Sequence, residues 1–250
     1  MASILQVQEL VCKVSGYTIL NGLNLTLEEG EMRVVLGPNG AGKTTMIDMI
    51  SGRYKPFSGK IIFGGKDITG YPSHKTSGMG IGRKFQVPNI YVSLTVYENV
   101  MICSEGYRSV FGSLFHRPSA KDEQNFVEIL DLIGLADKAQ DEAGTLSHGE
   151  RQWLEIGMLV SSNPKLLLLD EPTTGMTVAG KAKTAELIKK IAKKHTLLVV
   201  EHDMHFIRQI ASKITVLHQG RVIAEGAMHE VENDPKVKEI YLGKGAISNA

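Results

Sequence analysis

Gly37-Pro38-Asn39-Gly40-Ala41-Gly42-Lys43-Thr44 is the stretch of this 250-residue sequence that decides its fold. It satisfies the pattern G-x-x-x-x-G-K-[ST], and it lies between the buried-type strand 31–36 and a helix expected from about residue 43 to residue 51. In that setting the glycines allow backbone N–H groups to turn inward around a β-phosphate, and the helix start offers its positive end. The flanking strand and helix favour this interpretation over a chance glycine-rich turn.

The residue types in this loop also predict its chemistry. Lys43 would neutralise β- and γ-phosphate oxygens, and the Thr44 hydroxyl would ligate Mg²⁺. The predicted nucleotide-binding residues of the segment are Gly37, Pro38, Asn39, Gly40, Ala41, Gly42, Lys43, Thr44 and Thr45. These residues indicate a P-loop ATPase or GTPase that works with Mg²⁺.

A second apolar run, Leu166 to Leu169, ends in the acidic pair Asp170-Glu171. On a parallel sheet the carboxyl ends of the strands are where ligands bind, so both carboxylates are expected beside the same phosphates. Asp170 is predicted to serve the Mg²⁺ shell, and Glu171 to orient and polarise the attacking water. An acidic pair at a strand end can also cap a helix, but the presence of Lys43 favours the hydrolytic role.

The other apolar runs predict an α/β fold. Residues 166–169, 196–200 and 214–217 are short strands separated by helical stretches, which indicates a parallel sheet covered on both faces. Residues 4–27 are typical of antiparallel strands with turns at Ser15-Gly16 and Asn21-Gly22. Residues 87–145 have helical periodicity without a convincing strand. We therefore expect a P-loop NTPase (RecA-like) parallel-sheet core, an N-terminal antiparallel β subdomain and an inserted α-helical subdomain.

A single domain spanning residues 1–250 is expected, because the sequence has no internal repeat and no low-complexity linker. Its predicted parts are a core with the β subdomain (1–86 and 163–232), a helical subdomain (87–162) and a C-terminal tail (233–250). The tail is assigned no function.

The composition excludes several classes of protein. The 28 basic and 27 acidic residues give a net charge of +1, so a nucleic-acid partner is not expected. Cys12 and Cys103 have no CxxC spacing, which indicates neither a disulfide framework nor a zinc site and is typical of a reducing compartment. The sequence opens without a secretory-signal pattern, and no run approaches the roughly 20 apolar residues of a membrane-spanning helix.

Leu146-Ser147-His148-Gly149-Glu150 resembles the LSGGQ signature of ABC ATPases, with His148 and Glu150 in place of the third and fifth residues. Physically it is a second anion-binding helix start, with a serine cap and a glycine for close approach. The resemblance implies a head-to-tail dimer, in which Ser147, Gly149 and Glu150 of one chain cover the γ-phosphate of ATP bound by the other. His148 is given no chemical role. The second ATPase subunit is either a copy of this chain or a related chain.

Two more residues match family landmarks. Gln86 resembles the Q-loop glutamine, which contacts Mg²⁺ and the attacking water and reports them to the membrane partner. His202 resembles the switch histidine that contacts the γ-phosphate. A histidine at a strand end is more often structural, but its place after the Asp170-Glu171 strand favours the functional role. The predicted catalytic residues are Lys43, Glu171 and His202, and the predicted Mg²⁺ residues are Thr44, Gln86 and Asp170.

The sequence departs from the family pattern at two places. The aromatic residue that stacks on adenine would align nearer Val14 than Tyr17, so Tyr17 is a candidate for that role. The D-loop, usually ending in Asp, is here Thr174-Gly175-Met176-Thr177, which implies an altered contact across the dimer. Neither departure affects the phosphate chemistry.

The resemblance extends to one branch of the family. Segments 81–86, 146–158, 171–177 and 200–204 look like the urea-uptake branch of the branched-chain amino acid and amide importers. Subunits for branched-chain amino acids would have an arginine pair at Gln152-Trp153 and a Leu-Asn type of D-loop at Met176-Thr177. Urea or a short-chain amide is therefore the expected solute, with a branched-chain amino acid as the alternative. This subunit would not contact the solute.

The resemblance also implies a peripheral subunit on the cytoplasmic face of the inner (plasma) membrane, bound to transmembrane permease subunits. The segment from Asn89 to Tyr97 would dock a coupling helix of the permease or pack between the subdomains, and the sequence leaves both open. A soluble ABC ATPase acting as an ATP-gated clamp is the alternative from another class, but the coiled coils or second ATPase unit typical of it are not found. A regulatory GTPase would need an N-K-x-D motif, which is also not found.

Overall fold

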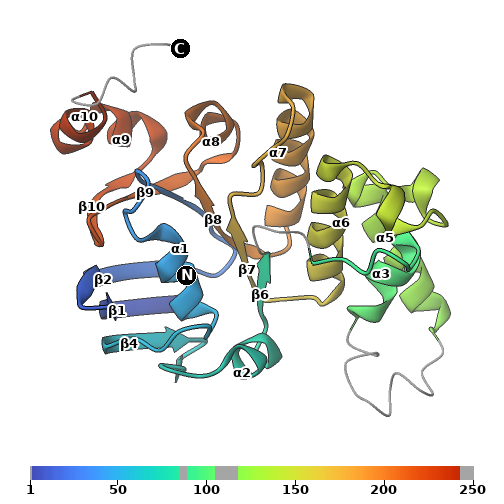
Figure 1. The fold of residues 1–250 in the computed structure, drawn as a ribbon, viewed down its shortest axis with the longest axis horizontal. Helices are drawn as coiled ribbons and strands as arrows, with labels where there is room; N and C mark the ends of the chain where they lie inside the picture. Colours follow the sequence, from blue (N-terminus) through green and yellow to red (C-terminus); the bar gives the residue numbers. More distant parts are fainter. Residues whose placement is uncertain (1, 85–88, 105–117, 243–250) are drawn as a thin grey trace.

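The computed structural model describes residues 2–84, 89–104 and 118–242, and it has the predicted α/β fold (Figure 1). Its main sheet has six strands in the order β10-β9-β3-β8-β7-β6. In chain order these strands are β3 (Met32–Leu36), β6 (Ile81–Lys84), β7 (Leu166–Asp170), β8 (Thr196–Glu201), β9 (Lys213–His218) and β10 (Arg221–Gly226). Neighbouring strands are parallel except for β9 and β10, which form an antiparallel edge.

Both faces of this sheet are buried. Along β3, Val34 and Leu36 belong to one hydrophobic cluster, whereas Val35 belongs to a second. Successive side chains of a strand point to opposite faces, so each face needs its own cover. Helices α7 (Val178–Ala192) and α8 (Met204–Ile210) contribute to the first cluster, and α1 (Lys43–Ile50) contributes to the second. This double cover explains the apolar runs of β7, β8 and β9.

A second, antiparallel sheet closes over α1 and has the order β2-β1-β4-β5. Its strands are β1 (Ser3–Val14), β2 (Tyr17–Glu28), β4 (Ser58–Phe63) and β5 (Lys66–Asp67). The predicted turn at Ser15-Gly16 joins β1 to β2. In Figure 1 this sheet lies at the opposite side of the molecule from helices α5 and α6.

The predicted turn at Asn21-Gly22 is wrong, because both residues lie inside β2. Leu10 pairs with Leu23 and Val11 pairs with Asn21, which leaves Gly22 as an extra residue in the β1–β2 pairing. Gly22 has a φ of 70°. The Asn-Gly pair therefore forms a β-bulge, which uses the same left-handed backbone that a tight turn uses.

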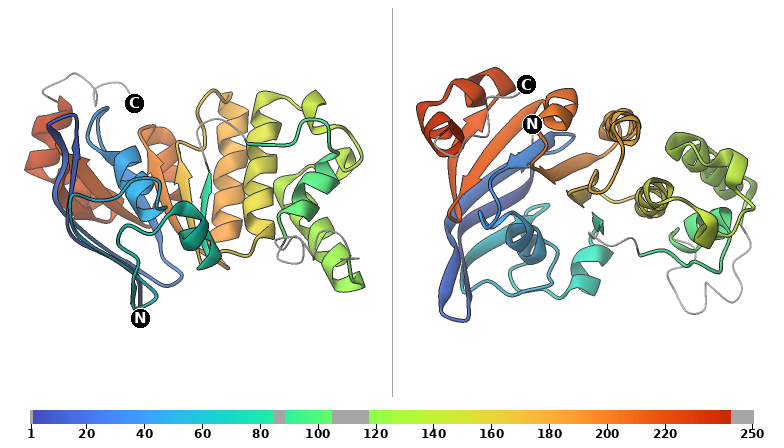
Figure 2. Two further views of the ribbon diagram at one scale, coloured as in Figure 1. Left: turned by 60° about the horizontal axis from the view of Figure 1, so that its bottom comes forward. Right: turned by 45° about the horizontal axis from the view of Figure 1, so that its top comes forward.

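The helical part consists of α3 (Val96–Ile102), α5 (Ala120–Ile133) and α6 (His148–Ser161), which pack beside α7 (Figures 1 and 2). The periodicity predicted the buried face of α5, formed by Phe126, Ile129, Leu130 and Ile133. Two 3₁₀ turns, Ala136–Lys138 and Ala143–Thr145, connect α5 to α6. Residues 87, 162 and 232 stay predictions as boundaries; in the structure β6 ends at Lys84 and α6 ends at Ser161.

The remaining helices are α2 (Ser73–Gly78), α9 (Met228–Asn233) and α10 (Pro235–Leu242). Val231 of α9 and Val237 of α10 pack into the same hydrophobic cluster as α7 and α8. No helix among the described residues is long and apolar enough to cross a membrane.

Candidate functional site

The glycine-rich loop connects the central strand β3 to α1. Gly40 and Gly42 have φ angles of 79° and 101°, a backbone region that other residues rarely adopt. A Cβ on Gly37 would lie 2.4 Å from the Leu217 carbonyl oxygen, so the loop also needs glycine there. No side chain caps the start of α1. The first N–H groups of this helix are therefore available to an anion.

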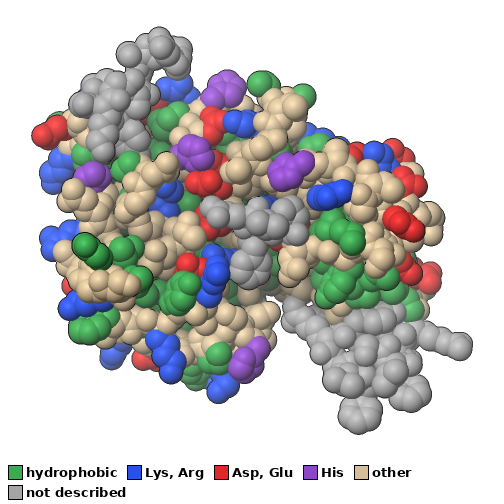
Figure 3. Space-filling model, in the orientation of Figure 1, with side chains coloured by type: hydrophobic (Ala, Val, Ile, Leu, Met, Phe, Trp, Pro, Cys, Tyr) green, Lys and Arg blue, Asp and Glu red, His purple; other side chains and the backbone are tan. Residues whose placement is uncertain are grey.

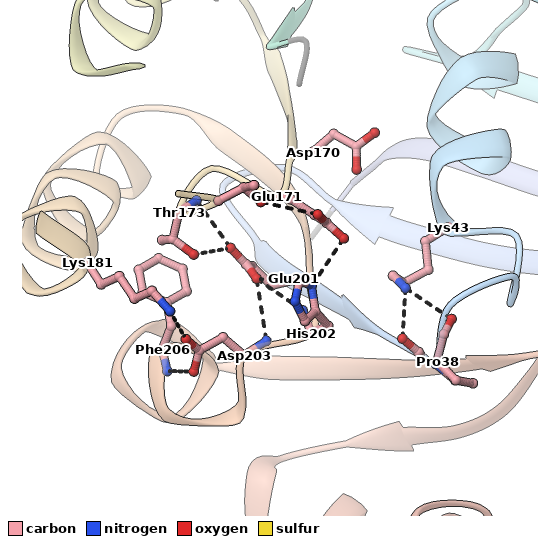
Figure 4. A network of polar contacts seen from close by, with 12 residues as sticks. Pro38, Lys43, Asp170, Glu171, Thr173, Lys181, Glu201, His202, Asp203 and Phe206 are labelled. Atoms are coloured by element: carbon pink, nitrogen blue, oxygen red, sulfur yellow. Dashed lines mark hydrogen bonds and ion pairs between the residues drawn. The ribbon is translucent and has the colours of Figure 1, made fainter. Parts of the chain in front are cut away.

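Lys43 lies inside the curve of this loop (Figure 4). Its Nζ donates hydrogen bonds to the carbonyl oxygens of Gly37 at 2.7 Å and Pro38 at 3.2 Å. Burial lowers the pKa of Lys43, and the nearby carboxylates, chiefly Glu171 and then Asp170, oppose that shift. The lysine is thus held close to the acidic end of β7, as the sequence predicted for a phosphate-binding lysine.

Asp170 and Thr44 face each other across the site. The Thr44 hydroxyl donates to Asp170 Oδ1 at 3.4 Å. Asp170 is buried, and its Oδ2 has no hydrogen-bond partner among the described residues, although Arg83 Nη2 lies 3.8 Å away. Burial raises the pKa of Asp170, and Arg83 opposes the shift. A buried carboxylate oxygen beside a hydroxyl fits Mg²⁺, which proteins hold through one or two carboxylates together with phosphates and water.

Glu171 follows directly after β7, with only part of its side chain exposed. Its Oε1 lies 3.1 Å from His202 Nδ1, and its Oε2 accepts a hydrogen bond from the Thr174 hydroxyl at 3.2 Å. The backbone of Glu171 is left-handed, with a φ of 46°, and its N–H donates to the Val200 carbonyl at 2.9 Å. The ends of β7 and β8 therefore bring the predicted carboxylate and the predicted histidine together.

Glu201, to which the sequence analysis gave no role, joins the loops after β7 and β8 (Figure 4). It is 1% exposed. Its Oε1 accepts from the Thr173 hydroxyl at 2.5 Å and the Thr173 N–H at 3.3 Å. Its Oε2 accepts from the N–H groups of His202 at 3.0 Å and Asp203 at 3.5 Å. All four groups donate, so this side chain must accept at both oxygens, and it fixes the backbone of His202.

We expect Glu201→Gln to weaken the site although glutamine has almost the same shape. The amide NH₂ would face N–H or O–H donors and leave them unpaired in a buried place, which costs about 2 kcal/mol. The unfolding free energy in urea should fall by about that amount, and kcat for ATP about tenfold, with KM unchanged. Thr173→Val, which removes one of the four donors, should have a smaller effect. A Glu201→Gln variant with wild-type kcat would contradict this role.

The predicted signature segment forms the start of α6. Ser147 is the N-cap, and it exchanges hydrogen bonds with Glu150: the Ser147 N–H donates to Glu150 Oε2 at 2.9 Å, and the Glu150 N–H donates to Ser147 Oγ at 3.4 Å. Lys138 Nζ donates to Glu150 Oε1 at 2.6 Å, and this contact chiefly lowers the pKa of Glu150 to about 2. A Cβ on Gly149 would meet no described atom within 4 Å, so the outer side of the turn is open.

The structure describes two further predicted residues, Tyr17 and Thr45. Tyr17 begins β2 and is 76% exposed, opposite Val14 in the β1–β2 pairing. Thr45 is half-buried in the first turn of α1. Gln86 lies outside the described residues. No hydrogen bond or ion pair joins loop 37–45 to residues 147–150 in the part of the chain that the structure describes.

Comparisons with known proteins place these motifs in a family. The profile of the family described as "ABC transporter" matches residues 20–174, and that of "Branched-chain amino acid ATP-binding cassette transporter" matches residues 221–247. The chain is 38% identical over 248 residues to the probable branched-chain amino acid transport ATP-binding protein LivG of Archaeoglobus fulgidus, covering 96% of this chain and 95% of that protein. It is 33% identical over 250 residues to the high-affinity branched-chain amino acid transport ATP-binding protein BraF of Pseudomonas aeruginosa, covering 96% and 98%.

Two solved structures are also similar. One is the crystal structure of the ADP conformation of an ATP-binding cassette of an ABC transporter, with a TM-score of 0.82, 31% identity, and 98% of this chain and 100% of that chain covered. The other is a dimeric, post-hydrolysis ATP-binding cassette bound to ADP and Pi, with a TM-score of 0.73, 26% identity, and 90% and 98% covered. The chain thus belongs to the ABC transporter family, as a subunit that binds and hydrolyses ATP.

Proposed function

We propose that this chain drives an importer by closing with a second ATPase chain over two ATP molecules. In each site Lys43 binds the β- and γ-phosphates, Glu171 orients and polarises the attacking water, and His202 contacts the γ-phosphate. Thr44 and Asp170 hold Mg²⁺, which neutralises phosphate oxygens when bound. The observation that carries this proposal is the contact between Glu171 and His202, close to the lysine of the glycine-rich loop.

The site is proposed to be completed by the second chain. Ser147 begins α6 in the helical part, whereas Lys43 begins α1 in the core. Both helix starts can bind an anion. The open side of Gly149 leaves room for a phosphate of the ATP that is bound by another chain. One of the similar solved cassettes is dimeric and bound to ADP and Pi, which supports the pairing of two ATPase chains. The second chain is either another copy or a related ATPase subunit.

The membrane partner is proposed to bind between the core and the helical part. A groove of about 790 Å³ lies there, lined by Arg53 and His74 from the core and by Tyr91 and Met158 from the helical part. On the face shown in Figure 3, hydrophobic side chains gather over the helical part. A permease bound in this groove would hold the subunit on the cytoplasmic face of the plasma membrane.

The segment from Asn89 to Tyr97 serves both of the roles that the sequence left open. Val96 is buried, and Tyr97 packs edge-to-face on Phe126, with ring centroids 5.8 Å apart. Tyr91 and Val92 are 56% and 55% exposed. The second half of this segment therefore packs internally, while the first half offers apolar anchors to a partner.

We propose a branched-chain amino acid as the solute. The two relatives described above are named for branched-chain amino acid transport, and a profile of the same description matches residues 221–247. These names favour the alternative solute over urea. The predicted urea or amide uptake, which rests on Gln152-Trp153 and Met176-Thr177, finds no support in them.

Uptake in a strain without this gene tests the solute. We expect uptake of labelled leucine to fall to background and uptake of labelled urea to stay unchanged. The wild-type gene should restore leucine uptake, and a gene encoding Glu171→Gln should not. Loss of urea uptake alone would reverse the assignment. The clamp alternative would be favoured if neither uptake changed and no polytopic membrane protein copurified with the chain in detergent.

A further inference from the structure

The D-loop of this chain is held by its own signature helix. Gln152 Nε2 donates to the Thr174 carbonyl oxygen at 2.8 Å and lies 2.8 Å from His148 Nε2. His148 Nε2 also lies 3.2 Å from the Thr174 carbonyl oxygen. A Cβ on Gly175 would lie 3.0 Å from His148 Nε2, so the imidazole packs directly against this turn. The residue that replaces a family glycine thus has a specific contact.

The three polar atoms fit together in one hydrogen-bond pattern. The Gln152 amide group carries two N–H donors, and both the Thr174 carbonyl and a neutral imidazole nitrogen can accept. Gln152 therefore donates one hydrogen to Thr174 and the other to His148 Nε2, with the imidazole proton on Nδ1. Gln152 is 1% exposed, and its Oε1 has no hydrogen-bond partner among the described residues, so the two contacts of Nε2 hold the amide. His148 fixes the rotamer of Gln152, and Gln152 fixes the Thr174 carbonyl.

The same Thr174 also touches the hydrolytic carboxylate. Its hydroxyl donates to Glu171 Oε2 at 3.2 Å, and the Thr174 N–H donates to the Glu171 carbonyl at 3.2 Å. The other carboxylate oxygen of Glu171 contacts His202. A continuous path of hydrogen bonds thus runs from the start of α6, through Thr174, to Glu171.

We propose that His148 and Gln152 are positioning residues for Glu171, acting through Thr174. The inference rests on the proposed function, in which Glu171 orients water and Ser147, Gly149 and Glu150 cover the nucleotide of the second chain. When the start of α6 binds that nucleotide, the position of α6 sets the positions of the His148 and Gln152 side chains. These side chains in turn position Thr174 and its hydroxyl. Each chain then sets its own Glu171 according to the state of the opposite site.

The test measures steady-state ATP hydrolysis by His148→Ala, Gln152→Ala and Thr174→Val. Each change removes one link without touching a predicted phosphate ligand. Because one hydrogen bond is worth about 0.5–1.5 kcal/mol, we expect kcat to fall roughly three- to tenfold, with KM for ATP unchanged. The double variant His148→Ala/Thr174→Val should be no slower than the slower single variant, because both break the same path. His148→Gln, which restores an acceptor near Nε2, should recover most of the rate.

The controls separate this path from a loss of folding and from the proposed function. His229→Ala changes an exposed histidine on α9 and should keep the wild-type rate. If Gln152→Ala unfolds, His148→Ala and Thr174→Val still test the path from its two ends. Wild-type kcat in both of these variants, or additive losses in the double variant, would overturn the inference. The proposed function would stand in that case if Glu171→Gln were inactive, and it would fall with the inference if the wild-type protein hydrolysed no ATP.

Discussion

Glu171→Gln is expected to bind ATP normally and to hydrolyse it at least about a hundredfold more slowly than the wild-type protein. Glutamine keeps the size of the side chain and an oxygen for the Thr174 hydroxyl, which donates to Glu171 Oε2. It lacks the charge that would polarise water, and removing a general base typically costs 10²- to 10⁴-fold. We expect the dimer to reopen only after hydrolysis, so this variant should accumulate closed dimers with ATP. Phosphate release and size-exclusion chromatography with MgATP measure the two effects.

The matched control is Glu186→Gln on α7, where an exposed glutamate pairs with Lys189 at 3.0 Å. That pair is at the surface and should contribute little, so rate and dimerisation should both match the wild type. Hydrolysis by Glu171→Gln at the wild-type rate would contradict the proposal that Glu171 orients and polarises the attacking water. A slow variant that stays monomeric with ATP would keep the chemical role of Glu171 and refute a closed dimer of two copies of this chain.

Ser147→Arg is expected to abolish ATP-dependent dimerisation while leaving ATP binding to the monomer intact. The nucleotide-binding loop of the same chain has no hydrogen bond to residues 147–150 among the described residues. A bulky side chain at the start of α6 would clash with the nucleotide bound by the second chain. Removing one group that stabilises the transferred phosphoryl charge costs 10²–10³-fold, so hydrolysis should fall by about a hundredfold.

Ser119→Arg is the matched control, because Ser119 caps α5 with the same reciprocal bonds, in that case to Asp122. Both variants lose an N-cap, worth about 1 kcal/mol, and should unfold at similarly reduced temperatures. They should differ in dimerisation, which we would measure in the Glu171→Gln background by light scattering with MgATP. ATP-dependent dimers of Ser147→Arg would contradict the composite site.

The parts of the site that could be predicted from the sequence depend on contiguous residues. The loop from Gly37 to Thr44 and the pair Asp170-Glu171 each carry a complete local reason for their geometry. Parallel strands present their carboxyl ends at the same edge of a sheet, and this rule predicted that the loop and the acidic pair lie close together. The helical signature start was also local, since Ser147 and Glu150 cap α6 by themselves.

The parts that were missed depend on distant partners. Strand β6 has no apolar run, because Arg83 and Lys84 are buried through ion pairs with Asp48 at 2.6 Å and Glu155 at 3.5 Å. Neither partner is near β6 in the sequence, so no local pattern indicates the strand.

Two site residues were missed for the same reason. Glu201 gains its role from Thr173, 28 positions away. His148 gains its contact from Thr174, 26 positions away. In the family comparison His148 was a departure without a partner, and only the folded chain supplies one.

The left-handed backbone at Glu171 sets stability against activity at a single position. A residue with a side chain loses roughly 1–2 kcal/mol in this conformation, whereas glycine is free of that penalty and asparagine tolerates it. Random substitutions ranked by melting temperature would therefore favour glycine at position 171, and those ranked by turnover would favour the native carboxylate. Selecting variants of this ATPase for heat resistance alone would thus favour loss of the Glu171 carboxylate, on which turnover depends.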